Sequence, residues 1–219
     1  PIIIADNADA WGMTVTDFKN VAGRFNLMSK QACREFCGIN KLIEPVHIIE
    51  DGPVRSVIES VFSYNNSSIC MRYKLPKKGT EVEIDLSVLW NEKDKMLKLS
   101  VPINWKDCSY LGQVAFGVQS LPNDGTEVVA QKWTAVTSDK KASALTCIND
   151  GVYGSDFSED GLRITLLRSP AYTGHHDGKG GAVLPQDRYT TRVDQGKRKF
   201  KFWFNGSEII DRLEKIDRE

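Results

Sequence analysis

The chain has 219 residues, and its 29 basic side chains balance its 29 acidic ones, so the formal net charge is zero. Because no excess positive charge attracts phosphate backbones or anionic lipid, the composition argues against nucleic acid and membrane surfaces as partners. Every apolar run breaks off well short of the roughly 20 residues that a membrane-spanning helix needs, so the sequence predicts no transmembrane segment.

The N-terminal part of the chain, residues 1–50, shows no clean hydrophobic period and is predicted to be the least regular segment. It opens on Pro1 and lacks the basic region and the length of a signal peptide. We therefore expect residues 1–219 to form a single domain that is a fragment of a longer chain.

The middle of the chain alternates apolar and polar residues with the period of two that half-buried strands show. Two hairpins are predicted: residues 57–64 with 69–75 around a polar turn, and residues 81–90 with 96–102 around the turn NEKDK. Shorter strands are predicted at residues 113–119, 127–133, 144–149, 162–168 and 199–204.

These strands are separated by turns rather than by helices, which indicates antiparallel pairing. Two sheets packed face to face would bury the alternating apolar residues, so the predicted fold class is an all-β antiparallel β-sandwich. A short C-terminal helix is expected over residues 207–219, with Ser207 as its N-cap and apolar residues at helical spacing.

The five cysteines form neither a CxxC pair nor a set with histidine at metal-binding spacing, so we expect reduced, mostly buried thiols and a cytoplasmic location. Residues 172–192 form a long glycine-rich connection, the kind that is often functional. It contains His175, His176 and Asp177. Adjacent residues rarely bind one ion together, so a solvated loop is favoured there over a metal site.

The stretch from Asn149 to Arg168 contains a second set of candidates. Asn149, Asp150 and Gly151 are expected to form an Asx turn, and Gly154 and Gly161 would permit reversals around residues 155–160. By strand parity Arg168 shares the buried face of Leu162 and Ile164, so its five donors need a partner there. A structural ion pair is favoured, and a ligand hydroxyl is the alternative.

Several segments together, in this order, resemble the C-terminal β-region of the retaining α-mannosidases of glycoside hydrolase family 38. The segments are ADNADAWG, VLWNEKDKMLKLSVPINW, QVAFGVQSLPN, VVAQKWTAV, CINDGVYGSDFSEDGLRITLLRSPAY and VDQGKRKFKFWF. The first looks like the Asp-x-x-Asp-x-Trp-Gly pattern that precedes this region in the family.

This resemblance implies a supersandwich similar to galactose mutarotase, packed on the catalytic and helical domains of the same parent chain. In the family an aspartate nucleophile and a second carboxylate act on the sugar, and zinc gathers its hydroxyls. None of those catalytic motifs matches this sequence, so the fragment alone is expected to be inactive and without a cofactor. Zinc and the mannose-containing glycan are expected to bind the missing catalytic domain.

The resemblance also implies a role for Arg168, which ends the family's Leu-Leu-Arg-Ser segment and would complete one wall of the active-site cleft. Asn149, Asp150 and Tyr153 match its Asn-Asp-x-x-Tyr-Gly pattern and are candidates for the same wall. One departure is Arg198, which stands where family members commonly have a histidine.

Two other interpretations stay open at this stage. One is an autonomous carbohydrate-binding or mutarotase-like module, in which His175 or His176 with Asp177 would supply the acid and base. The other is a purely structural sandwich that stabilises its parent or a homo-oligomer. The sequence decides neither the oligomeric state nor the glycan.

Overall fold

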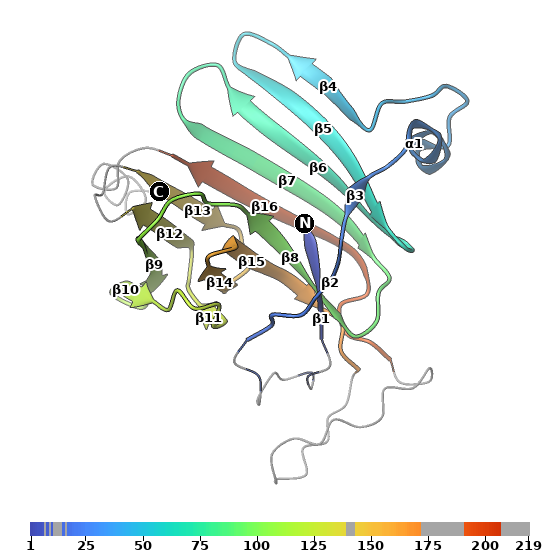
Figure 1. The fold of residues 1–219 in the computed structure, drawn as a ribbon. Helices are drawn as coiled ribbons and strands as arrows, with labels where there is room; N and C mark the ends of the chain where they lie inside the picture. The colour runs from blue at the N-terminus through green and yellow to red at the C-terminus, as the bar shows by residue number, and fades with distance from the viewer. Residues whose placement is uncertain are drawn as a thin grey trace.

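The computed structural model describes residues 1–6, 8, 10, 15, 17–138, 143–171 and 191–206. Within them every paired strand runs antiparallel to its neighbour, and the strands form two sheets (Figure 1). The C-terminal helix predicted over residues 207–219 lies outside the described residues. No helix within the described part of the chain is long and apolar enough to span a membrane.

The smaller sheet has six strands in the order β11 (Val128–Val129), β14 (Gly154–Ser158), β15 (Gly161–Arg168), β8 (Lys95–Val101), β1 (Ile2–Ala5) and β2 (Val21–Arg24). The larger sheet has ten strands. Its order is β10 (Gly117–Leu121), β9 (Cys108–Val114), β12 (Trp133–Ser138), β13 (Ala144–Asn149), β16 (Gly196–Asn205), β7 (Glu81–Trp90), β6 (Ser67–Pro76), β5 (Arg55–Tyr64) and β3 (Asn26–Leu27), with β4 (Val46–Asp51) also paired to β5.

The main core lies between the two sheets. Leu97 and Leu162 from the small sheet pack in one cluster with Val88, Trp90 and Phe202 from the large sheet, and each of these side chains is fully buried. Since alternate residues of each strand enter this layer, the period-two pattern in the sequence is accounted for. The prediction of an antiparallel β-sandwich is confirmed.

The connection between β7 and β8 differs from the prediction. Both strands were expected to pair as a hairpin, but β7 belongs to the large sheet and β8 to the small one. Leu86 and Val88 of β7 and Leu97 and Leu99 of β8 all face the inter-sheet core. The chain therefore crosses from one sheet to the other at the turn. If the two strands paired within one sheet, their apolar side chains would not face each other across the core.

Two shorter predictions were also wrong in their bounds. The strand expected at residues 113–119 is a hairpin of β9 and β10, whose turn contains the fully exposed Phe116 with a φ of 65°. The strand expected at residues 127–133 is divided between β11 in the small sheet and β12 in the large one. In the first case the apolar Phe116 occupies the turn, and in the second the chain bends at Gln131 and Lys132 within the expected strand.

One helix was missed in the region that showed no clean period. Helix α1 (Lys30–Cys37) starts at the N-cap Ser29, whose side chain accepts from the Ala32 N–H, and ends at Gly38 with a φ of 66°. Its buried Cys33 packs with Met28 and Val61 on the outer side of β5. The five cysteines are all free, as predicted, but only Cys33 and Cys147 are buried.

The turn between β14 and β15 is tighter than predicted. Residues 155–158 were expected in a reversal, but they belong to β14, and only Glu159 and Asp160 form the turn. Gly161 follows with a φ of 104°, and a Cβ placed there would lie 2.4 Å from the carbonyl oxygen of Val101. This position therefore requires glycine both for its backbone angle and for space.

We predict that Gly161→Ala lowers the free energy of unfolding by about 3 kcal/mol, because backbone strain and a backbone clash act together. The matched control is Gly151→Ala, which has a φ of 95° but no atom within 4 Å of the new Cβ, and which carries only the conformational cost of about 1 kcal/mol. Urea unfolding of both variants tests this. Equal losses in the two variants would show that the clash with Val101 has no effect.

Candidate functional site

Arg168 at the end of β15 forms a bidentate ion pair with Asp6. Its Nε donates to Oδ2 at 2.8 Å and its Nη2 donates to Oδ1 at 2.9 Å. The Asp6 side chain is fully buried, while that of Arg168 is 18% exposed. Asp6 comes directly after β1, so this pair ties the ADNADAWG segment to the other end of the chain. The predicted structural ion pair is thus present.

The face that Arg168 occupies is not the predicted one. The pairing of β15 with β8 shifts between Thr165 and Leu167, so that Leu167 rather than Leu166 lies opposite Leu97. This bulge places Arg168 on the outer face of the small sheet, opposite Met96, where its guanidinium lies 4.9 Å from the centre of the Phe18 ring. The extra residue reversed the parity that the sequence pattern implied.

A second ion pair lies at the same end of the small sheet. Arg192 donates from Nε to Asp94 Oδ1 at 3.0 Å, and its side chain is only 2% exposed. The backbone N–H of Asp6 donates to the Asp94 carbonyl, and the Asp94 N–H donates to the Ser169 carbonyl. Four segments distant in sequence are therefore fastened together where β1 and β15 end and β8 begins.

The other three wall candidates, Asn149, Asp150 and Tyr153, lie at the end of β13 and in the connection that leads to β14. The Asn149 side chain accepts from the N–H groups of Gly151 and Val152 and donates to the carbonyls of Gln131 and Lys132, which confirms the Asx turn. Asp150 follows it on the large sheet. Tyr153 comes directly before the small-sheet strand β14, with 53% of its surface exposed. Among the described residues, the ion pair of Arg168 is with Asp6 and not with any of these three side chains.

The remaining candidates, His175, His176 and Asp177, lie outside the described residues, so both the solvated loop and the mutarotase-like alternative stay predictions. Within the described ranges, no group of three or more His, Cys, Asp or Glu side chains lies close enough together to hold a metal ion.

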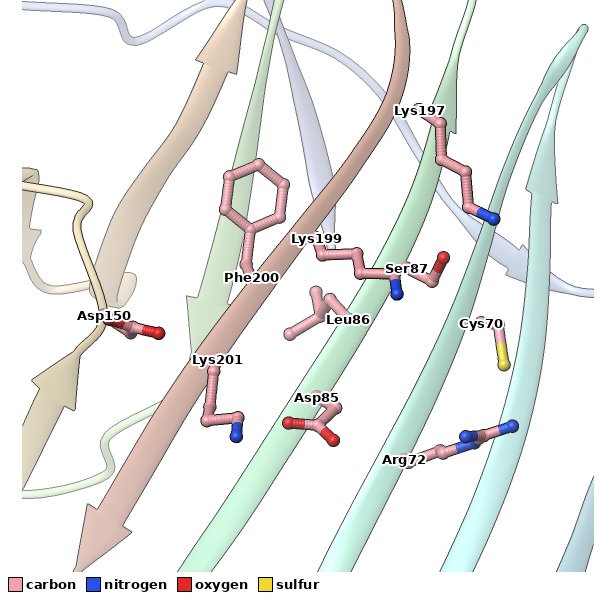
Figure 2. Close-up of a pocket in the computed structure, with 10 residues that line it drawn as sticks. All are labelled: Cys70, Arg72, Asp85, Leu86, Ser87, Asp150, Lys197, Lys199, Phe200 and Lys201. Carbon is pink, nitrogen blue, oxygen red and sulfur yellow. The ribbon is translucent and has the colours of Figure 1, made fainter.

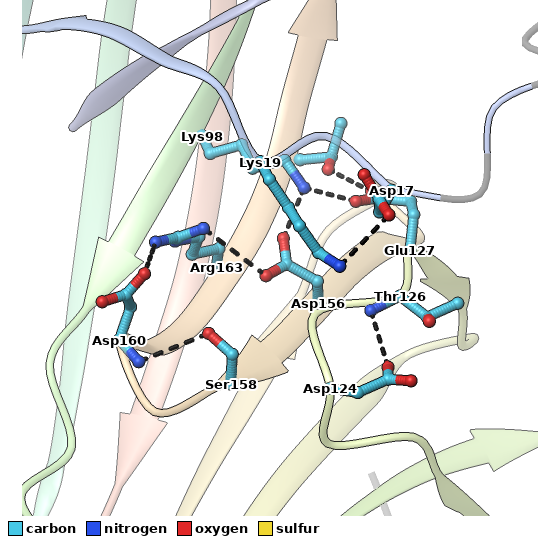
Figure 3. Close-up of polar contacts among 11 residues, drawn as sticks. Asp17, Lys19, Lys98, Asp124, Thr126, Glu127, Asp156, Ser158, Asp160 and Arg163 are labelled. Atoms are coloured by element: carbon cyan, nitrogen blue, oxygen red, sulfur yellow. Dashed lines mark hydrogen bonds and ion pairs between the residues drawn. The ribbon is translucent and has the colours of Figure 1, made fainter.

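The sequence analysis missed a charged cluster on the outer face of the small sheet (Figure 3). Lys98 is fully buried, and its Nζ donates to Asp156 at 2.5 Å and to Glu127, which also accepts from Thr165. Lys98 points away from the core because its neighbours Leu97 and Leu99 point into it. The Phe18 ring lies 5.9 Å from Nζ.

The electrostatics of this cluster are set by burial. Burial raises the pKa of the Asp156 carboxyl, and the neighbouring Glu127 carboxylate acts in the same direction, while Lys98 opposes both. A carboxyl with a raised pKa beside a lysine is a combination that acid–base chemistry uses. Asp156 is only 2% exposed and Lys98 is fully buried, so the geometry supports a structural role rather than contact with a substrate.

A hollow of about 470 Å³ lies on the outer face of the large sheet (Figure 2). Small side chains of Ser87 and Cys70 form its base, and Lys197 and Lys199 extend over it from β16. Asp150 lies at its margin. Burial raises the pKa of the Cys70 thiol to about 11, so this cysteine is protonated at neutral pH and is not a nucleophile.

Two antiparallel sheets that pack face to face, fastened at one end by ion pairs, define a β-sandwich domain. A family model described as the glycosyl hydrolases family 38 C-terminal domain matches residues 17–180, which is more than half of the chain. The chain belongs to this family. The resemblance seen in the sequence is thereby confirmed.

Two solved structures from Enterococcus faecalis have the same fold. One is a protein in glycosyl hydrolase family 38, with a TM-score of 0.70 at 13% identity over 99% of this chain and 27% of that chain. The other is an α-mannosidase, with a TM-score of 0.71 at 11% identity over 99% of this chain and 26% of that chain. This chain therefore spans about a quarter of their length. No curated protein matches it.

We predict that Arg168→Gln lowers the free energy of unfolding by about 3 kcal/mol, because it leaves the Asp6 carboxylate buried without a charged partner. The matched control is Arg198→Gln, which removes an exposed pair with Asp194 and is expected to cost less than about 0.5 kcal/mol. Denaturant unfolding measures both. A loss below about 1 kcal/mol for Arg168→Gln would contradict the assignment of a buried structural pair.

A pH series on Asp156→Asn tests the charged cluster. Because the Asp156 pKa is raised on folding, its contribution to stability is complete below the ordinary pKa of aspartate and is lost as pH rises through the folded value. The stability of the unmodified protein relative to the variant should therefore fall as pH rises above about 4, the ordinary pKa of aspartate.

Asp124→Asn supplies a control of opposite sign. The pKa of Asp124 is lowered, chiefly by its hydrogen bonds with Thr126, so the contribution of this carboxylate is present at higher pH and is lost as pH falls. Relative to the Asp124 variant, the unmodified protein should gain stability with rising pH. The same sign for both variants would refute the assignment made for Asp156.

Proposed function

We propose that this chain is the non-catalytic C-terminal β-domain of a retaining, zinc-dependent α-mannosidase that hydrolyses α-linked mannose from glycans. The observation that carries the proposal is the family match over residues 17–180. It is supported by the likeness of the fold to part of a longer α-mannosidase. The partners of the domain would be the catalytic and helical domains of the same parent chain.

Within that parent, the end of the small sheet that contains Arg168 is the proposed wall of the active-site cleft. Buried ion pairs fix the ends of β1 and β15 and the start of β8 there, which gives the wall a rigid base. The pair with Asp6 uses Nε and Nη2 of Arg168. A sugar hydroxyl or a carboxylate of the catalytic domain would then approach the wall beside this ion pair.

Zinc in the parent would stabilise charge on the sugar hydroxyls and orient them. The described residues of this chain do not fit a zinc site, because no group of three or more potential ligands gathers among them. In this proposal the metal binds the catalytic domain, together with the nucleophile and the acid–base carboxylate. The five free cysteines support the proposal of a reducing, cytoplasmic setting.

The test is hydrolysis of 4-nitrophenyl α-mannoside by the full-length protein that contains this chain, with the anomer of the product followed by NMR. We expect retention of configuration and loss of activity with a zinc chelator. In Arg168→Lys, which keeps the charge but loses the planar fork, kcat/KM should fall at least about tenfold, or about 1.4 kcal/mol of transition-state stabilisation.

Gly161→Ala is the control, because it destabilises the domain at the opposite end of β15. If Arg168→Lys lost no more activity than this control at a matched folded fraction, Arg168 would have only a structural role. A folded full-length protein that hydrolyses no α-mannoside would contradict the proposed function as a whole.

A further inference from the structure

A second hollow lies at the opposite end of the small sheet from Arg168. Its volume is about 970 Å³. It is lined by residues 103–107 after β8 with Cys108 at the start of β9, by Asn123 after β10, and by the end of β14 (Phe157 and Ser158) with Glu159 of the following turn. This volume is at the upper end of the range typical of ligand sites. Neither the ion pairs around Arg168 nor the charged cluster around Lys98 contributes to its lining.

The hollow contains an accessible indole. Trp105 is 37% exposed, whereas Trp90 and Trp133 are at most 2% exposed in the core. The loop that carries it is held in place, because the Cys108 thiol donates to the carbonyl oxygens of Trp105 at 3.5 Å and of Lys106 at 3.8 Å. The buried Phe157 supplies part of the apolar lining. A large aromatic surface is thus presented to solvent on a fixed turn.

Four of the polar side chains that line the hollow are without a partner among the described residues. No hydrogen bond or ion pair holds the side chain of Asn104, Asp107, Asn123 or Glu159 among the described residues. Elsewhere in the fold, the amide of Asn149 is held by four hydrogen bonds. The hollow therefore offers amides that both donate and accept, and carboxylates that accept, around an apolar surface.

We propose that this hollow is a binding site for a neutral oligosaccharide. A pyranose ring has an apolar C–H face, which suits the Trp105 indole, and a rim of hydroxyls that both donate and accept hydrogen bonds, which suits the amides and carboxylates. Two carboxylates against the single cation Lys106 give the lining a negative balance. That balance disfavours an anionic sugar and selects a neutral one.

The site is separate from the proposed active-site wall. Strand β8 begins at Lys95, whose carbonyl accepts from Ser169 beside Arg168, and ends at Val101, just before the hollow. Its seven residues span about 20 Å. The proposal does not depend on hydrolysis, since the local chemistry of the lining carries it.

The test follows ¹⁹F NMR of the full-length protein labelled with 5-fluorotryptophan, with the Trp105 resonance assigned from Trp105→Phe. Mannotetraose and maltotetraose are the neutral probes, and a hyaluronan tetrasaccharide is the anionic one. We expect the Trp105 resonance to shift saturably with at least one neutral probe, at a Kd of about 1 mM. The Trp203 resonance, from the outer face of the large sheet, should not move.

Two variants sharpen the test. Asn123→Ala should weaken binding at least about fivefold, because a sugar hydroxyl loses its amide partner. Asn40→Ala, at an exposed asparagine after helix α1, should leave the Kd unchanged. The proposal is overturned if Trp105 does not respond to either neutral probe at about 20 mM, or if Asn123→Ala has no effect. An equal response to the anionic probe overturns the neutral selectivity.

Because no step of this test uses hydrolysis, its outcome is independent of the proposed α-mannosidase activity. If the protein is inactive but still shows the Trp105 shift, the result supports the binding site and contradicts the proposed function. If the protein is active but shows no shift, the result supports the proposed function and contradicts the binding site.

Discussion

The constraint on which this structure depends is the burial of one face of each sheet against the other. Neither sheet can bury its apolar face alone, so the residues of β7, β8, β15 and β16 must point into a shared layer. This requirement sends the chain from one sheet to the other between β7 and β8. It also assigns the alternate residues of every strand to an outer face, and the polar chemistry of the domain lies on these outer faces.

The ion pairs on the two outer faces differ in how far they are removed from water. On the small sheet, the ion pairs of Lys98 and Arg168 are largely removed from water, so their partners are needed to offset desolvation rather than to add much net stability. On the large sheet, Lys74 bridges Glu83 and Asp85 in a more exposed setting, where such pairs contribute little. The small sheet is therefore the face on which a single charge substitution has structural consequences.

The sequence predicted the sandwich and most long strands because alternation of apolar residues reports directly on burial of one face. It failed where a strand changes partner or gains a residue. The alternation of β7 and β8 is the same whether they pair as a hairpin or face each other across the core. The bulge near Leu166 cannot be recognised in the sequence Leu-Leu-Arg, so Arg168 was assigned to the wrong face.

The same distinction between local and long-range features applies to the site residues. Arg168 and Asn149 could be identified from the sequence because a cation ending a strand and an Asn-Asp-Gly turn are local patterns. The partner of Arg168 lies 162 residues away, and only the fold brings Asp6 to it. Nothing local in the sequence signals that Asp156 and Glu127 converge on Lys98. Ion pairs between residues far apart in the sequence are thus the feature of the site that the sequence pattern could not predict.

The position of β8 explains how one small sheet can support two chemically different ends. At its start, the ion pairs of Arg168 with Asp6 and of Arg192 with Asp94 neutralise these charges and fasten the strand ends, which gives this end of the sheet a fixed shape. At its end, the side chains of Asn104, Asp107, Asn123 and Glu159 around Trp105 are without partners among the described residues and are exposed to solvent. Satisfied polar groups favour rigidity, whereas unsatisfied ones favour binding, so the two ends of this strand are suited to different tasks.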